Sequence, residues 1–191
     1  MTTAQGRNPA GTRTPRIDRD AGDASLLAAI KDFQAAVARG CRELDLVTGE
    51  LVRLRSARVH DCRTCRSVRL GAAATAGVDA PLTDKIDDHE HSDLPERTKA
   101  ALRVVDWLIS RPDPADVAVT APARAELSAA ELTDLCLHVV KNSYQKVLVS
   151  LGLDDIDPAT LNDEGIAYYD FREDGSRTAF RSDAPVRPGG G

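Results

Sequence analysis

The sequence predicts an all-α fold, and three observations lead to this prediction. Alanine, leucine and arginine, which favour helices, are common in the middle of the chain. Apolar residues recur there at helical spacing, as in the segment ASLLAAIKDFQAAVAR. Helix-capping residues and glycines flank these segments, whereas no segment convincingly predicts a core strand. We therefore expect a bundle of about six helices.

The predicted helices follow one another with short connections. They cover residues 24–39, 49–59, 61–77, a short turn at 82–88, a helix from the 93–96 region to 110, and 129–151. Asp61 is placed to cap the third helix, and Asp93 with Glu96 resembles a capping box for the fifth. Ser128 with Glu131 forms a clearer capping box for the last and longest helix.

The helices define one domain with an extension at each end. Residues 23–153 form the predicted helical domain, and residues 1–22 are predicted to be a disordered tail. Three prolines in 111–125 predict a linker inside the domain. The C-terminal extension, 154–191, shows a weak hairpin pattern around Asp174-Gly175 and then a disordered end.

The composition excludes several classes of function. The net charge is −5, arginines are interspersed with acidic residues, and aromatic residues make up only 4%, which argues against nucleic-acid binding. No apolar run approaches the roughly 20 residues of a membrane span. The amino terminus lacks the apolar core of a signal peptide, so we expect a cytoplasmic protein in which a CxxC pair is redox-active or metal-binding.

The most reactive segment contains two cysteines and an upstream carboxylate. Cys62 and Cys65 are spaced to lie on one face of a helix, with Glu50 twelve residues before the first of them. If the helices on either side of residues 60–61 form a tight hairpin, Glu50 lies opposite Arg69. The hairpin then brings Glu50, Arg69 and Cys65 into a line of contacts.

This arrangement favours a reactive thiol at either position. Cys62 is predicted at the first helical position, where the helix dipole and free amide groups favour a thiolate. Arg69 favours the same ionisation at Cys65, and Arg63 and Arg66 add positive charge. The residues alone therefore leave the order of the two thiols open, and the dipole argument favours Cys62.

The block ELVRLRSARVHDCRTCRSVRLGAAATAG resembles the core of the carboxymuconolactone decarboxylase superfamily, and within it the CxxC-containing alkylhydroperoxidase D branch. That branch has a glutamate about twelve residues before the first cysteine, as Glu50 stands here, and a later helix similar to the one with Asn142. The resemblance covers about residues 24–153. It implies an all-helical protomer in a homotrimer or homohexamer, with Cys65 as the peroxidatic and Cys62 as the resolving cysteine.

The resemblance also implies substrates and partners. The substrate is a hydroperoxide or a disulfide, and the electron donor is a dithiol protein, either thioredoxin-like or lipoyl-bearing. We expect no cofactor, metal, nucleic acid or membrane as a partner. The expected activity is that of a thiol–disulfide oxidoreductase that extends to peroxide reduction, an antioxidant function.

The chain departs from this branch at two positions. Thr64 and Arg69 stand where the branch places histidines. A guanidinium stays charged and cannot pass a proton from a carboxylate to a sulfur, so a Glu50–Arg69 pair is predicted to hold charge rather than relay protons. His60 is the nearby substitute.

Two other functions remain open. A cofactor-free lyase of the lactone decarboxylase type needs no CxxC pair, and a non-catalytic oligomeric helical protein needs no chemistry at all. The non-catalytic protein could also be stabilised by zinc, bound by the CxxC pair together with Cys41 and Cys136. Cys41 and Cys136, however, lie in apolar helical contexts, where a cysteine is usually a small buried residue.

Other polar groups are predicted to have structural roles. His89 and His91 lie in an acidic loop whose composition resembles a metal site. Such a loop is more typically exposed to solvent, and we expect this one to be so. Its acidic residues are Asp87, Asp88, Glu90 and Asp93. His138 and Trp107 are predicted to be packed in the core or at a subunit interface.

Overall fold

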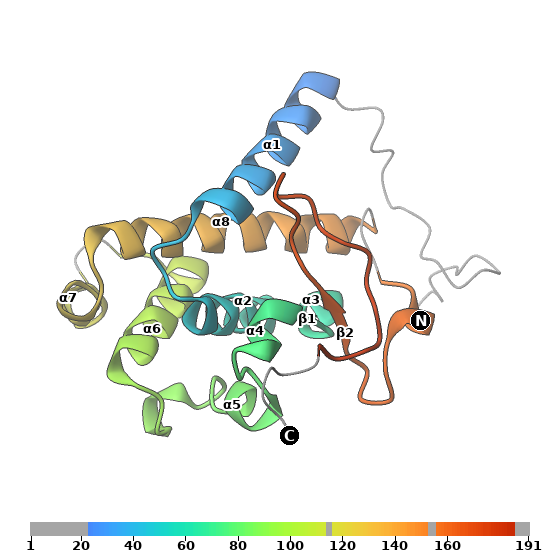
Figure 1. The fold of residues 1–191 in the computed structure, drawn as a ribbon. Coiled ribbons are helices and arrows are strands. Elements are labelled where there is room, and N and C mark those ends of the chain that lie inside the picture. The colour runs from blue at the N-terminus through green and yellow to red at the C-terminus, as the bar shows by residue number, and fades with distance from the viewer. Residues whose placement is uncertain (1–22, 114–115, 153–155, 186–191) are drawn as a thin grey trace, which may run out of the picture.

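The computed structural model describes residues 23–113, 116–152 and 156–185, and within them the protein is predominantly helical (Figure 1). These residues form eight α-helices, two more than the approximate number predicted. The helices are α1 (Ala24–Gly40), α2 (Leu46–Val59), α3 (Arg63–Arg66), α4 (Gly71–Thr75), α5 (Ala80–Asp84), α6 (Glu96–Ser110), α7 (Val117–Glu126) and α8 (Ala129–Leu151). The other elements are the strands β1 (Val68–Leu70) and β2 (Ala167–Tyr169) and the 3₁₀ turns η2 (His89–His91) and η3 (Pro158–Thr160).

Helix α2 is the centre of the fold. It packs against both α6 and α8, and α7 packs on the far side of α6 (Figure 1). Its residues Leu51, Val52 and Leu54 are at most 1% exposed, so the helix is buried on several sides rather than along one stripe. The main hydrophobic core surrounds it and includes Leu102 of α6 and Leu135 of α8.

The first and last helices confirm the sequence prediction closely. Helix α1 begins after Asp23, whose side chain accepts a hydrogen bond from the Ser25 amide. Helix α8 begins at the predicted capping box of Ser128 and Glu131, in which both reciprocal hydrogen bonds are present. It ends at Gly152, which adopts a left-handed conformation.

The predicted helix over residues 61–77 is wrong, because the chain forms two short helices separated by a strand. Helix α3 ends at Arg66, and β1 then pairs in parallel with β2, with Val68 opposite Ala167. The Arg53 guanidinium donates to the carbonyl oxygens of Cys65 and Val68, at 3.0 and 2.6 Å. These carbonyls are satisfied by a side chain from α2, and the strand hydrogen bonds replace those of a continuous helix.

The predicted linker over 111–125 is also wrong, because α7 forms there. Asp116 caps this helix by accepting from the amides of Ala118 and Val119, and Pro122 lies inside it. The helix packs on α6 and buries Ala123 in the main core. Packing thus outweighs the helix hydrogen bond that the proline removes.

The capping box predicted from Asp93 and Glu96 does not form. Pro95 is the N-cap of α6 and provides no side-chain hydrogen bond. Asp93 instead pairs with Lys85 at 2.6 Å, and Glu96 with Arg103 at 2.7 Å. Asp93 therefore connects to the end of α5, whereas Glu96 pairs within α6.

The C-terminal extension packs on the helical domain over residues 156–185 (Figure 1). A turn at the predicted Asp174-Gly175 position is present, bounded by an isolated bridge between Phe171 and Arg177. The turn lies against α1, where Arg39 donates to the Asp174 carbonyl. The predictions of disorder for 1–22 and for the end of the chain at 186–191 lie outside the described residues.

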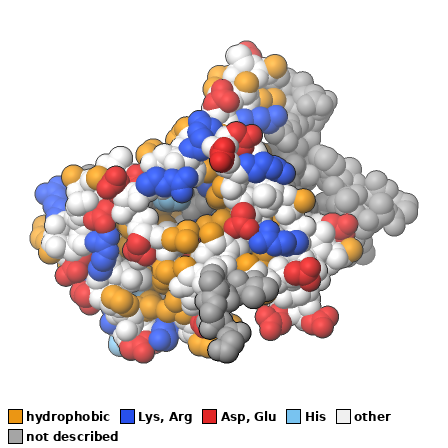
Figure 2. Space-filling model, viewed as in Figure 1, with side chains coloured by type: hydrophobic (Ala, Val, Ile, Leu, Met, Phe, Trp, Pro, Cys, Tyr) orange, Lys and Arg blue, Asp and Glu red, His pale blue; other side chains and the backbone are white. Residues whose placement is uncertain are grey.

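Two surface properties are plain. Charged side chains of both signs are interspersed over the face in Figure 2, around an apolar area in its lower middle part. In the part of the chain that the structure describes, no helix combines the length and the apolar character needed to cross a membrane.

Candidate functional site: a dithiol at the edge of a basic cavity

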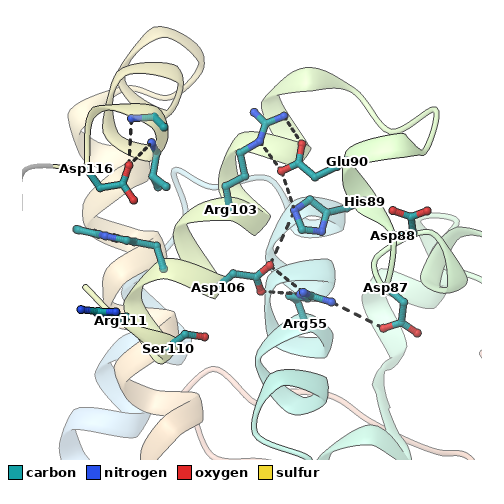
Figure 3. Close-up of a pocket in the computed structure, with 13 residues that line it drawn as sticks. Arg55, Asp87, Asp88, His89, Glu90, Arg103, Asp106, Ser110, Arg111 and Asp116 are labelled. Atoms are coloured by element: carbon teal, nitrogen blue, oxygen red, sulfur yellow. Dashed lines mark hydrogen bonds and ion pairs between the residues drawn. The ribbon is translucent and has the colours of Figure 1, made fainter. Parts of the chain in front are cut away.

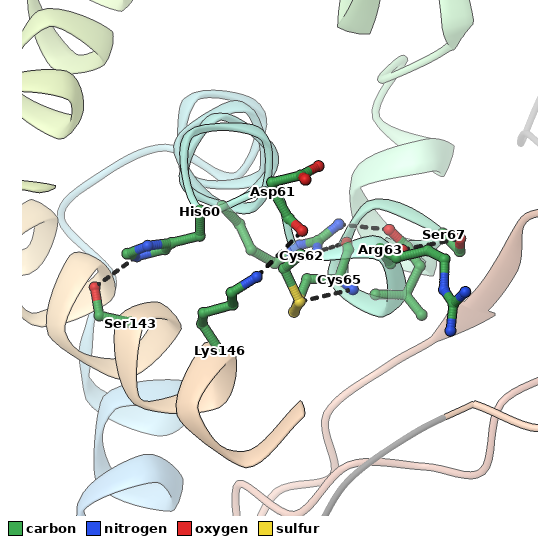
Figure 4. Close-up of a disulfide and its surroundings, with 10 residues drawn as sticks. His60, Asp61, Cys62, Arg63, Cys65, Ser67, Ser143 and Lys146 are labelled. Carbon is green, nitrogen blue, oxygen red and sulfur yellow. Dashed lines mark hydrogen bonds between the residues drawn. A yellow bond between two sulfur atoms is a disulfide. The ribbon is translucent and has the colours of Figure 1, made fainter. Parts of the chain in front are cut away.

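The two cysteines of the CxxC motif are joined as a disulfide at the start of α3, between α2 and α8 (Figure 4). Their Cα atoms are 5.3 Å apart. Cys62 is the N-cap of α3, whereas the sequence predicts it at the first helical position. Its sulfur accepts a hydrogen bond from the Cys65 amide at 3.4 Å. Cys62 is 1% exposed, whereas Cys65 is half-buried, so Cys65 is the more exposed residue of the pair.

Both cysteines line a cavity of about 590 Å³. Its walls come from α1, α2, α8 and the C-terminal extension. Among the predicted site residues, Cys62, Cys65 and His60 line it, whereas Glu50 and Arg69 do not. The volume lies within the range of small-molecule sites, so a ligand can reach the dithiol from this side.

Glu50 pairs with Arg53, not with Arg69. The Arg53 guanidinium donates to both carboxylate oxygens of Glu50, each at 2.7 Å, and the Leu70 amide donates to the same carboxylate at 3.1 Å. The expected facing pair fails because α3 is only one turn long, so no second helix runs back along α2. Glu50 therefore acts on Cys65 indirectly, through the Arg53 contact with the Cys65 carbonyl.

Arg53 remains charged in this buried position. Burial opposes its charge, but the Glu50 carboxylate outweighs burial and raises the pKa of Arg53 above its ordinary value. Arg69 forms no ion pair with any carboxylate among the described residues. It donates to the carbonyls of Arg66 and Val68, and burial and the Arg53 charge lower its pKa. The predicted pairing of Glu50 with Arg69 is therefore wrong, and Arg53 is the guanidinium that pairs with Glu50.

His60 ends α2 and lies beside the cysteine pair (Figure 4). Its Nε2 atom is 3.0 Å from the Ser143 hydroxyl of α8. Burial lowers the pKa of His60, and Lys146 adds to this effect. Lys146 itself donates to the Asp61 carbonyl at 3.1 Å, in the turn where Asp61 adopts a positive φ of 49°. Both effects favour the neutral form of the His60 imidazole.

The sequence did not reveal several residues of the cavity. Arg53 lies three residues after Glu50, a spacing that predicts a contact on one helical face and could have identified the pair. Lys141 and Phe171 gave no such indication, because they come from α8 and the C-terminal extension, which meet only in the folded protein. Burial and the nearby Arg53 charge lower the pKa of Lys141 to about 8.

The acidic loop predicted to be solvated lies apart from this cavity, beside a second, open hollow that residues of α6 also line (Figure 3). Glu90 accepts two hydrogen bonds from Arg103, each at 2.7 Å. His91 is 2.7 Å from Asp88, and His89 is 5% exposed and 3.4 Å from Glu90. Within the described residues, no three side chains of His, Cys, Asp or Glu are grouped so as to hold a metal ion.

The remaining cysteines and His138 are set in less reactive surroundings. Burial raises the pKa of Cys41 to about 11, and Asp134 contributes to this rise. Burial also raises the pKa of Cys136. Burial lowers the pKa of His138 to about 4, which fits the packed histidine that the sequence predicts.

A predominantly helical fold with a CxxC pair after a central helix defines the class: the chain has an alkylhydroperoxidase D-like (AhpD-like) fold. A crystal structure of a protein of unknown function from Agrobacterium tumefaciens, suggested to be the antioxidant defence protein AhpD, matches with a TM-score of 0.59 and 17% identity. The match covers 75% of this chain and 99% of that one. It establishes the fold.

Sequence comparison identifies similar but uncharacterized proteins. Two proteins from two strains of Mycobacterium tuberculosis are each 43% identical to this chain over 128 residues. The match covers 66% of this chain and 45% of each relative, so the chain spans less than half the length of these relatives. No protein-family model matches the chain.

Proposed function

We propose that this protein is a thiol–disulfide oxidoreductase that reduces hydroperoxides with the Cys62–Cys65 pair. The observation that carries the proposal is the disulfide itself, which lies at the edge of a cavity large enough for a small molecule. The AhpD-like fold, shared with a suggested antioxidant protein, supports the same chemistry. A soluble dithiol reductant, thioredoxin-like or lipoyl-bearing, regenerates the pair.

Cys65 is more exposed than Cys62, which supports Cys65 as the residue that attacks the peroxide. The Cys65 thiolate attacks the terminal oxygen of the hydroperoxide, so an S–O bond forms, the O–O bond breaks and an alcohol leaves. The Cys62 thiolate then attacks the resulting sulfenic acid, forming the disulfide and releasing water. The two protons taken up by the leaving oxygens are those that the two thiols lose.

The Cys65 amide suits the resolving role of Cys62. This amide points at the Cys62 sulfur, and an N–H donor at a helix start stabilises a thiolate there. Arg53 holds the Cys65 carbonyl and so fixes the turn that contains both sulfurs. The contacts of the Cys65 amide and of Arg53 do not depend on histidines at positions 64 and 69.

The test counts free thiols after a stoichiometric amount of cumene hydroperoxide. The reduced protein has four cysteines, and we expect two thiols to disappear and to return with dithiothreitol. Cys65→Ser should abolish the loss, whereas Cys136→Ser, which changes an exposed lone thiol, should preserve it. If all four thiols survive the peroxide, the proposal is wrong.

The same variants separate this function from the alternatives. A lactone decarboxylase-like lyase would remain active in the Cys62→Ser/Cys65→Ser double variant, because its chemistry needs no thiol. A non-catalytic protein would show neither activity. Light scattering of the purified protein tests the proposed homotrimer or homohexamer.

A further inference from the structure

The cavity beside the dithiol carries more positive than negative side chains. Five lining residues are cationic and two are acidic: Lys31, Arg53, Lys141, Lys146 and Arg177 against Asp32 and Asp174. A cavity that is partly closed and lined by one sign of charge attracts ligands of the opposite sign. The excess of cations therefore points to an anionic ligand.

Two of these five cations have a polar partner in the protein. Arg53 is paired with Glu50, and Lys146 donates to the Asp61 carbonyl. Lys141, like Lys31 and Arg177, makes no ion pair with any carboxylate in the parts of the chain that the structure describes, and its Nζ atom lies over the Phe171 ring. Its charge is thus available to a ligand in the cavity.

The surroundings of Lys141 are apolar on one side and polar on the other. Its Nζ atom lies 4.5 Å from the centre of the Phe171 ring. Phe171 belongs to an aromatic group in which Tyr169 contacts both Phe171 and Phe180 edge-to-face, at 5.4 and 6.0 Å between ring centres. On the other side, the Nδ2 donor of Asn142 has no hydrogen-bond partner among the described residues.

We propose that this cavity selects an organic hydroperoxide that carries a carboxylate on an apolar body. The carboxylate binds Lys141, the apolar body lies against Phe171 and Phe180, and the hydroperoxide group reaches Cys65. This inference rests on the proposed peroxidase function for turnover, but its binding part does not. The carboxylate is unchanged in the reaction, in which the peroxide becomes an alcohol and water as the dithiol becomes a disulfide.

The C-terminal extension is what gives the cavity this selectivity. Phe171, Phe180 and Tyr169 all come from it, whereas the dithiol and Lys141 belong to the helical domain. Strand β1 follows the CxxC segment in the sequence, and β2 pairs with it in parallel. This pairing places the aromatic group beside the CxxC segment. The extension therefore acts as a specificity element beside a dithiol supplied by the helices.

Turnover is compared for linoleic acid hydroperoxide and its methyl ester, which differ only in the charge of the head group. With dithiothreitol as reductant at pH 7, we expect the acid to show a KM about tenfold lower than that of the ester, the size of one charge-assisted hydrogen bond. Lys141→Gln should raise the KM for the acid to that of the ester and leave the ester unchanged. Lys141→Arg should restore part of the preference, and Lys99→Gln, the same change on α6, should have no effect.

Binding is measured separately with octanoate and octanol, which cannot react with the thiols. Calorimetry on the oxidised protein should detect octanoate binding that Lys141→Gln weakens about tenfold, with octanol bound weakly by both. Octanoate binding without any peroxide consumption would refute the peroxidase function and keep the anion site. Peroxide consumption with equal KM values for acid and ester, or octanoate binding unaffected by Lys141→Gln in a variant with unchanged circular dichroism, would overturn the present inference.

Discussion

Glu50 and Arg53 form a bidentate ion pair whose arginine also holds the carbonyls of Cys65 and Val68. The Glu50 side chain is only 1% exposed and that of Arg53 is 13% exposed. One buried pair thus connects the central helix to both the dithiol turn and the first strand. The pair thereby fixes the backbone of the turn that carries Cys65.

Glu50→Gln is predicted to destabilise the protein by about 3 kcal/mol, because it leaves the Arg53 charge buried without a counter-charge. Urea unfolding measures the loss. The exposed Glu43→Gln is the matched control and should change stability by less than about 0.5 kcal/mol. Glu50→Gln combined with Arg53→Met should recover part of the loss, and a double variant as unstable as the sum of the single ones would contradict the pairing.

Arg69→Ala is predicted to cost about 1 kcal/mol or less, because its guanidinium bonds only to two nearby carbonyls and is partly exposed. A loss as large as that of Glu50→Gln would mean that the sequence-based pairing of Glu50 with Arg69 is correct in solution. Urea unfolding of both variants under identical conditions decides between the two arrangements.

Helices with strong local patterns could be predicted from the sequence, and those determined by distant contacts could not. Helix α8 carries its own capping box at Ser128 and its own stop at Gly152, so its ends are local properties. The break after α3 is different, because it depends on β2, about a hundred residues later, and on Arg53 from the preceding helix. Helix α7 was missed because a proline-rich composition hides a helix that packing stabilises.

The site divides in the same way. Cys62, Cys65 and His60 are predicted from a short segment of sequence, and the structure places all three at one cavity. The pairing of Glu50 depended on an assumed hairpin of two long helices, and the structure has a single turn there instead. Lys141 and Phe171 belong to elements that meet only through tertiary contacts, so no local pattern identifies them.

The ionisation of Lys141 gives anion binding a defined pH dependence. Its pKa is lowered from 10.5 to about 8 in the folded protein, so the ammonium charge is present below pH 8 and is lost above it. The groups that act on it are Arg53 and Glu50 of α2 and Cys41, which follows α1. Octanoate affinity should therefore decrease about tenfold for each pH unit above the pKa of about 8 that Lys141 has in the ligand-free protein. An affinity that stays constant to pH 10 would exclude Lys141 as the anion ligand.

His138 should make stability decrease as the solution becomes acidic. Its pKa is about 4 in the folded protein and 6.5 when exposed, so the unfolded chain binds the extra proton between these pH values. Stability is then full above about pH 6.5 and decreases as the pH falls toward 4, by about 2 kcal/mol for this partly exposed group. His138→Gln should flatten that part of the profile of unfolding free energy against pH. A profile of unchanged slope would show that other groups cause the acid sensitivity.

Gly175→Ala tests whether the C-terminal extension must sit against α1 to form the cavity. Gly175 has a φ of 79°, and a Cβ atom there would lie 2.4 Å from the Ala35 carbonyl oxygen. Gly165→Ala is a matched control, because its φ of 73° imposes the same backbone strain while a Cβ atom meets nothing within 4 Å. Both variants should lose about 1 kcal/mol of stability from strain, and only Gly175→Ala should also detach the turn from α1.

Hydrogen exchange over residues 166–181 and the KM ratio of acid to ester hydroperoxide report this detachment. Faster exchange and a ratio near one are expected for Gly175→Ala alone. Equal behaviour of the two variants would mean that the contact with Ala35 does not hold the aromatic wall in place.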